Sequence, residues 1–155
     1  MINHYISKSF VLACCLAMVP LIVSAAQTGL PQGTFSGQGV WDAIDGSEGT
    51  YETSYTIDGS RLEMSYTYDR EGNPEAGHHE LQIEGRTGGR FELVDEDGNA
   101  AGQGFCRADT CLLKYTFPGG SVEQSLRLEG DKLISVGMKN VRGFEIHWVE
   151  TLTRK

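Results

Sequence analysis

Turn-forming residue pairs recur along this chain at short and regular intervals. Examples are Asp45-Gly46, Asp58-Gly59, Asp97-Gly98, Pro118-Gly119 and Gly130-Asp131, and each offers Gly, Asp or Pro where a backbone can reverse direction. The segments between the turns hold about 6–12 residues and are rich in Tyr, Thr, Val, Ile and Phe, which favour strands. No stretch beyond residue 26 has the apolar period of an amphipathic helix. The chain is therefore expected to fold into many short strands.

Ten segments have the composition and length of strands. They are residues 33–42, 49–58, 60–69, 77–85, 89–95, 100–107, 110–117, 120–129, 132–139 and 142–153. Consecutive antiparallel strands joined by short loops form a meander, and closing the meander into a barrel leaves no strand edge unpaired. We therefore predict an all-β fold, a single antiparallel up-and-down meander barrel of about ten strands, with no helix after the N-terminal segment.

Polar and apolar residues alternate along the predicted strands. Val122, Leu126 and Leu128, for example, alternate with Glu123 and Arg127. A period of two with charges on one face means that one face is buried and the other lies in water. The charged face must point outwards, so the predicted barrel has an apolar interior. An outer-membrane barrel has the opposite pattern, and we expect no membrane insertion of this barrel.

The inward face of the predicted barrel is rich in aromatic residues and includes all five tyrosines that follow residue 26. A buried phenol needs a hydrogen-bond partner, which can be a ligand or an inward polar group. The candidate ligand-binding residues are Trp41, Tyr51, Tyr55, Tyr66, Tyr68, His79, Tyr115, Gln124, Trp148 and Glu150. The alternative is that the same rings fill the barrel as an ordinary core.

The first 26 residues have the pattern of a secretory signal peptide. Lys8 precedes an apolar run from residue 10 to residue 23, and Ser24-Ala25-Ala26 supplies small residues for cleavage. The run is shorter than the ~20 residues of a transmembrane helix, although an uncleaved membrane anchor is the alternative. We expect residues 1–26 to be removed, residues 27–155 to form the barrel domain, and the protein to be exported to the periplasm or the extracellular space.

The chain is acidic, with 13 Lys and Arg against 21 Asp and Glu and a formal charge of −8. Phosphate-rich partners need a basic protein surface. Nucleic acid is therefore not expected as a partner, whereas a small apolar molecule is compatible with this composition. The sequence identifies no protein partner.

Cys106 and Cys111 are the two cysteines that follow residue 26. They flank a short predicted turn, so they would face each other on adjacent antiparallel strands, within reach of a disulfide. An even pair of cysteines in an exported chain usually oxidises. We expect a structural disulfide between them.

Patterns for catalysis and metal binding are weak in this sequence. No nucleophile-elbow motif is present. His78 and His79 are neighbours, so on a strand they point to opposite faces and cannot chelate together. We expect no enzyme activity, no metal site and no cofactor, with haem as a minor alternative.

Two motifs on the first predicted strand resemble known families. Gly39-Val40-Trp41 resembles the Gly-x-Trp signature of the calycin superfamily, which includes lipocalins, fatty-acid-binding proteins and avidins. An Arg or Lys from the last strand packs on that Trp in these families, which implies this role for Arg154. Residues 33–39 are similar to the opening motif of nitrobindins, ten-stranded haem barrels, with Phe35 in place of their Trp.

The nitrobindin resemblance implies that His147 could ligate haem iron, because a C-terminal His does so in that family. Strand alternation, however, places His147 on the outer face beside Glu145 and Thr151. Inward placement of an axial His is needed for this function, so a bulge would have to shift the strand.

Three functions remain open at this point. The first is an exported small-molecule-binding barrel with an apolar, tyrosine-lined cavity. The second is a filled structural or interaction barrel that acts through its acidic outer surface. The third is a haem-binding, nitrobindin-like barrel. The state of the interior separates the first two, because a filled barrel has no room for a ligand.

Overall fold

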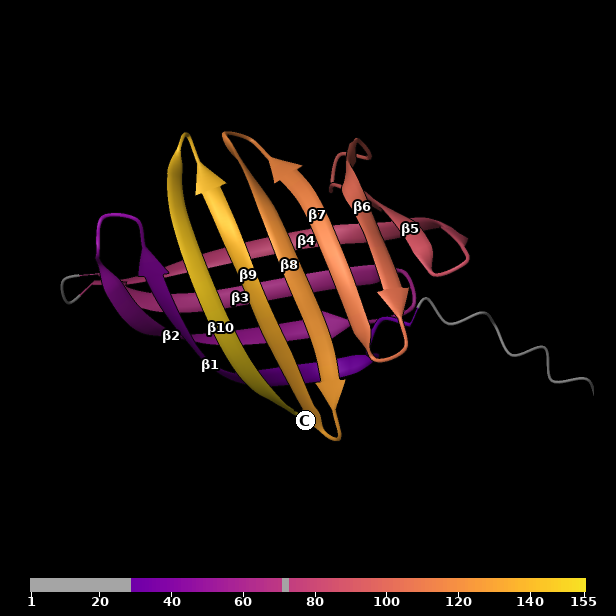
Figure 1. Cartoon of the computed structure of the whole chain (residues 1–155), viewed down its shortest axis with the longest axis horizontal. Coiled ribbons are helices and arrows are strands. Elements are labelled where there is room, and N and C mark those ends of the chain that lie inside the picture. The colour runs from indigo at the N-terminus through magenta and orange to yellow at the C-terminus, as the bar shows by residue number, and fades with distance from the viewer. Residues whose placement is uncertain (1–28, 71–72) are drawn as a thin grey trace, which may run out of the picture.

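The computed structural model describes residues 29–70 and 73–155, and it confirms the predicted all-β fold. Ten strands follow one another along the chain (Figure 1). They are β1 (Gly33–Ala43), β2 (Glu48–Ile57), β3 (Arg61–Arg70), β4 (Asn73–Thr87), β5 (Arg90–Val94), β6 (Ala100–Arg107), β7 (Thr110–Phe117), β8 (Gly120–Glu129), β9 (Lys132–Val141) and β10 (Phe144–Arg154). The described residues contain no helix, and hence none long and apolar enough to cross a membrane. The predicted signal peptide, with its cleavage site, lies outside the described residues.

All neighbouring strands are antiparallel and the meander is closed, because β1 pairs with β2 on one side and with β10 on the other. The largest departure from the predicted boundaries is in β4, which extends beyond both ends of the segment 77–85. Gly85 has a φ of 58°, and the register of β4 against β5 shifts between Glu84 and Thr87. Such a bulge lets the strand continue through a glycine that resembles a turn in the sequence.

The barrel is flattened into two layers, with β6 to β10 crossing in front of β1 to β4 (Figure 1). Inward side chains of the two layers meet between them. Leu62, Leu93, Leu126, Leu133 and Leu152 have no exposed surface, and they belong to one apolar cluster. This part of the interior is therefore filled by side chains.

The segment before β1 covers the filled end of the barrel. Leu30 is 3% exposed and packs in the apolar cluster, and Pro31 is also buried. The Arg154 guanidinium donates a hydrogen bond from Nη1 to the carbonyl oxygen of Gln32, at 2.8 Å. This hydrogen bond connects the segment before β1 to the last residues of β10 at the filled end of the barrel.

The expected packing of Arg154 on Trp41 is wrong. The β1–β10 register places Arg154 opposite Phe35 and places Trp41 opposite Trp148, six residues further along β1. The Arg154 guanidinium lies 4.9 Å from the centre of the Phe35 ring. Phe35 thus occupies the position that the calycin resemblance had assigned to Trp41.

The expected disulfide is present between Cys106 on β6 and Cys111 on β7. Both residues are buried in the apolar cluster. They are five positions apart in sequence, so the bond closes only a short loop.

Replacing Cys106 and Cys111 together by Ala should lower the free energy of unfolding by about 2 kcal/mol, at the low end for disulfides because the closed loop is short. Urea unfolding of the variant and of the oxidised parent measures this difference. Two titratable thiols per chain in the unreduced parent protein would contradict the prediction.

Candidate ligand-binding site

A cavity of about 250 Å³ lies in the half of the barrel away from the N-terminal segment. Its lining comprises Trp41, Tyr51, Thr53, Tyr55, Met64, Tyr66, Tyr68, His79, Tyr115, Val122, Gln124, Lys139, Ile146, Trp148 and Glu150. The ten candidate residues from the sequence are all among them. The interior is thus filled at one end and hollow at the other, so neither extreme, an empty or a full barrel, describes it.

Six aromatic side chains of the interior pack against glycines of the adjacent strand. The cross-strand pairs are Trp41 with Gly49, Tyr51 with Gly39, Tyr66 with Gly77, Phe91 with Gly104, Phe117 with Gly120, and Trp148 with Gly137. A Cβ atom at any of these glycines would overlap the paired ring. Because glycine has no Cβ, the rings rest on the barrel wall, and the four pairs that contain Trp41, Tyr51, Tyr66 and Trp148 leave the cavity between them open.

The floor of the cavity is a buried carboxylate that accepts hydrogen bonds from two phenols. Tyr51 donates to Oε1 of Glu150 at 2.7 Å, and Tyr55 donates to Oε2 at 2.6 Å. Glu150 is only 3% exposed. Charge-assisted hydrogen bonds of this kind compensate for the loss of water around a buried carboxylate.

Burial, and then the negative charge of Glu150, raises the pKa of Tyr51 and of Tyr55 above the ordinary phenol value. Burial also raises the pKa of Tyr115 and Tyr66. These phenols therefore remain protonated in the folded protein, so Tyr51 and Tyr55 remain hydrogen-bond donors to Glu150.

Gln124 and Ser135 extend the same network. The Gln124 amide donates from Nε2 to the Tyr55 hydroxyl at 2.6 Å and to Oγ of Ser135 at 3.0 Å, and the Trp148 indole donates to the same Oγ at 3.2 Å. Gln124 and Ser135 are 4% and 0% exposed. The amide oxygen of Gln124, Oε1, is buried and has no hydrogen-bond partner, which is uncommon for a buried polar atom.

Two cationic or titratable side chains lie nearer the opening of the cavity. The Lys139 amine lies 4.8 Å from the centre of the Phe117 ring, and the His79 ring lies 5.8 Å from the same ring. Burial lowers the pKa of Lys139. Burial also lowers the pKa of His79, and the nearby charges of Lys139 and His78 add to the effect.

Five residues of the lining were not among the sequence candidates: Thr53, Met64, Val122, Lys139 and Ile146. Lys139 is the charged one of the five, and it was missed because the charged face of the strands was assigned to the outside. The position of Lys139 on β9 does indicate that it points inwards. Leu133, Ser135 and Gly137 precede it at intervals of two residues and lie on the inner face. The glycines under the rings were also missed. Glycine inside a strand marks a place where another group approaches closely, and Gly39, Gly77 and Gly137 fit that rule.

His147 lies on the outer face, as strand alternation predicts, and is exposed. Its Nδ1 lies 3.2 Å from Oδ1 of Asp42, the residue opposite it on β1. The structure therefore separates His147 from the cavity. The histidine that lines the cavity is His79.

Among the described residues, one surface group has the geometry to hold a cation. Ligand atoms of His78, Glu80 and Glu96 lie within 4.8 Å of one another. His78 and Glu96 are exposed, and such acidic groups are common on protein surfaces without a metal. No other observation points to an ion there.

No family model and no curated protein matches the sequence. Among solved structures, the barrel is similar to an S-type phycobiliprotein lyase from Guillardia theta, with a TM-score of 0.66 and 12% sequence identity. The alignment covers 83% of this chain and 95% of the lyase. At this identity the likeness shows the fold alone.

Replacing Tyr55 by Phe should destabilise the protein by about 1–3 kcal/mol, because one Glu150 oxygen and the Gln124 amide then lose a buried partner. The matched control is Tyr66→Phe, since no hydrogen bond of the Tyr66 hydroxyl is found among the described residues. That control should change stability by less than ~0.5 kcal/mol. If both substitutions change the free energy of unfolding by the same amount in urea, the hydrogen bonds of the Tyr55 hydroxyl contribute nothing to stability.

Proposed function

We propose that this protein is an exported small-molecule-binding barrel that takes its ligand into the aromatic cavity. The observation that carries the proposal is the combination of a 250 Å³ space with apolar walls and a buried polar floor. Ligand sites are concave, mostly apolar, and have a few placed polar groups that fix orientation. The volume is slightly below the ~300–1,000 Å³ of common ligand sites, so a compact ligand is expected.

The similarity of its fold to a phycobiliprotein lyase supports the proposal that the barrel binds a small molecule. The Cys106–Cys111 disulfide supports export, because disulfides persist in oxidising compartments. Removal of residues 1–26 and a periplasmic or extracellular location belong to the same proposal.

The proposal is for binding without catalysis or a cofactor. A nucleophile needs a base within hydrogen-bond reach, whereas the Thr53 hydroxyl in the lining donates to the carbonyl oxygen of Ser65 at 3.2 Å. A haem-binding function would need His79 as the iron ligand in place of the exposed His147.

An apolar fluorescent dye, N-phenylnaphthylamine, should bind with one dye per chain and quench tryptophan fluorescence, because both tryptophans of the chain line the cavity. Tyr66→Ala should weaken dye binding at least about tenfold, since it removes one wall, whereas Tyr66→Phe keeps the ring and should retain affinity.

If the dye does not bind the parent and Tyr66→Ala only lowers the free energy of unfolding by about 3–5 kcal/mol, the tyrosines form a core and the proposed binding function is wrong.

A further inference from the structure

The floor of the cavity presents acceptors without enough donors. Both Glu150 oxygens accept from tyrosines, and the buried Gln124 Oε1 accepts from nothing. A buried acceptor without a donor costs about 1–3 kcal/mol. Gln124 lines the cavity, so a ligand that places an N–H or O–H group against this side chain, with the amide turned towards it, would supply the missing donor.

The opposite end of the cavity presents a cation without an acid. Lys139 is half-buried and lies beside the Phe117 ring, and none of the ion pairs among the described residues includes it. A partly desolvated ammonium pairs strongly with a carboxylate or another oxyanion. Lys139 is four residues beyond Ser135 on β9, which is about 13 Å at the rise of a strand.

The walls between these ends favour a flat ligand. Tyr51 and Tyr66 lie edge to face at 6.4 Å between ring centres, and Tyr66 and Tyr68 are stacked at 6.3 Å. Aromatic faces of this kind pack well against planar rings.

From these three observations we propose that the ligand is a planar aromatic acid, oriented with a hydrogen-bond donor at the Gln124 floor and its anionic group at Lys139. This assignment rests on the proposed binding function and adds the direction in which the ligand enters. Gln124 at the floor favours a ligand with a hydrogen-bond donor at its inner end. Lys139 near the opening favours a ligand with an acidic group at its outer end.

A matched set of four biphenyl probes tests the assignment by fluorescence titration. The first probe has an amino group and a carboxylate at opposite ends, the second has only the carboxylate, the third only the amino group, and the fourth neither. The doubly substituted probe should bind at least about tenfold more tightly than each singly substituted one, since each group adds about 1.4 kcal/mol or more.

Two variants locate the two ends. Lys139→Met should remove the advantage of the carboxylate and leave the amino probe unchanged, whereas Gln124→Met should do the reverse. If all four probes bind within twofold of one another, the ligand class is wrong while the binding function stands. If neither the biphenyls nor N-phenylnaphthylamine bind, both fail.

A separate observation concerns the outer surface of β6 to β10 and of the adjoining strand β1. Outward residues that are direct neighbours in the strand register form a transverse row of Val40, Val149, Val136, Ser125, Leu112 and Phe105. The five apolar members are 39–57% exposed. Contiguous exposed apolar surface of this kind marks an interaction site more often than scattered residues do.

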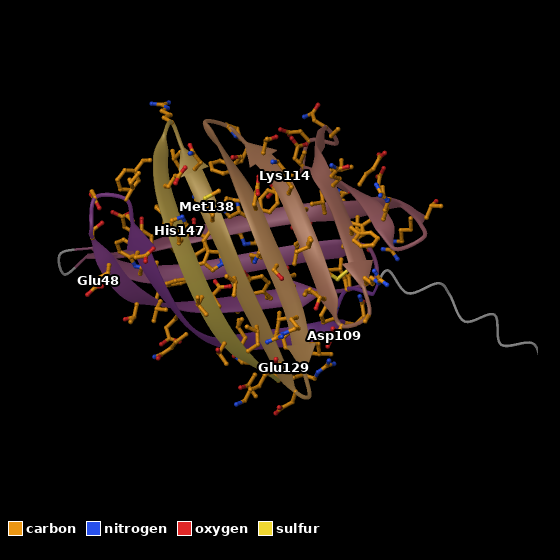
Figure 2. All side chains as sticks on the ribbon, in the orientation of Figure 1. Glu48, Asp109, Lys114, Glu129, Met138 and His147 are labelled. Atoms are coloured by element: carbon orange, nitrogen blue, oxygen red, sulfur yellow. A yellow bond between two sulfur atoms is a disulfide. The ribbon has the colours of Figure 1, made fainter. Side chains whose placement is uncertain are left out.

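The rows on either side of this apolar row differ in charge. The row on the cavity side contains Asp42, His147, Met138, Glu123, Lys114 and Gln103, whereas the row on the filled side contains Gln38, Thr151, Ile134, Arg127, Thr110 and Arg107. Figure 2 shows Lys114, Met138 and His147 of the first row crossing this layer. The first row has a net charge of −1 with His neutral, and the second has +2.

We infer that a second copy of this chain covers the apolar row, with a two-fold axis running along it. That symmetry turns the cavity-side row of one copy onto the filled-side row of the other. Within one copy Glu123 pairs with Lys114, and Arg127 pairs with Glu129. In the dimer Glu123 additionally faces Arg127 of the second copy, and Met138 faces Ile134 of the second copy. No two like charges meet, so the surface is complementary to itself in charge and in apolarity.

Sedimentation velocity over a range of protein concentrations tests the dimer. Val136→Lys should weaken dimerisation at least about tenfold, because it puts a charge into the centre of the row. The control Ile44→Lys changes an apolar residue that is 66% exposed in the β1–β2 turn, away from the row, and should leave the dimer unchanged.

Charge reversal tests the direction of the axis. Glu123→Arg should weaken the dimer, and adding Arg127→Glu should restore it. A parent protein that is monomeric at every concentration, or a dimer that Val136→Lys does not change, would overturn the assignment. Binding of the monomer to lipid vesicles through this row would also overturn it, in favour of a membrane surface as the occupant.

Discussion

The contact between inward aromatic rings and glycines of the neighbouring strand determines what the interior of this barrel can be. A ring that stands on a residue with a Cβ projects into the lumen, whereas a ring that lies on glycine stays at the wall. Trp41, Tyr51, Tyr66 and Trp148 all lie in this way around the cavity. In the filled half, leucines without exposed surface occupy the centre of the barrel. The same alternating strands therefore build a solid end and a hollow end.

The network of Tyr55, Gln124, Ser135 and Glu150 forms the boundary between the two ends. Each of these residues is followed or preceded two positions along its strand by a buried apolar residue, such as Leu126 after Gln124 and Leu152 after Glu150. The network keeps a carboxylate in the interior by surrounding it with phenol donors, and it leaves one amide oxygen facing no donor. A protein that needed only a stable core would gain by replacing such a network with apolar residues. Its presence beneath a cavity supports the proposed ligand-binding function.

Strand alternation and turn residues were sufficient to predict ten strands, their closure and ten of the fifteen residues that line the cavity. They succeeded because the period of two decides which face a side chain occupies, independently of the partner strand. Alternation does not decide which residue lies opposite which, and so it could not pair Arg154 with Phe35 or Tyr51 with Gly39. Lys139 was missed for a related reason, because a long side chain can point inwards and still keep its amine near the opening.

Glycines under the aromatic rings keep the cavity open, and Gly137→Ala tests this role most directly. The new methyl group would overlap the Trp148 ring, so the account predicts at least about a tenfold loss of N-phenylnaphthylamine affinity and a shifted tryptophan spectrum, with strand content retained by circular dichroism. The control Gly59→Ala adds the same methyl group in a turn where it meets only Nη1 of Arg86, at 4.0 Å, and it should bind the dye like the parent. Unchanged dye affinity in a folded Gly137→Ala protein would contradict the account.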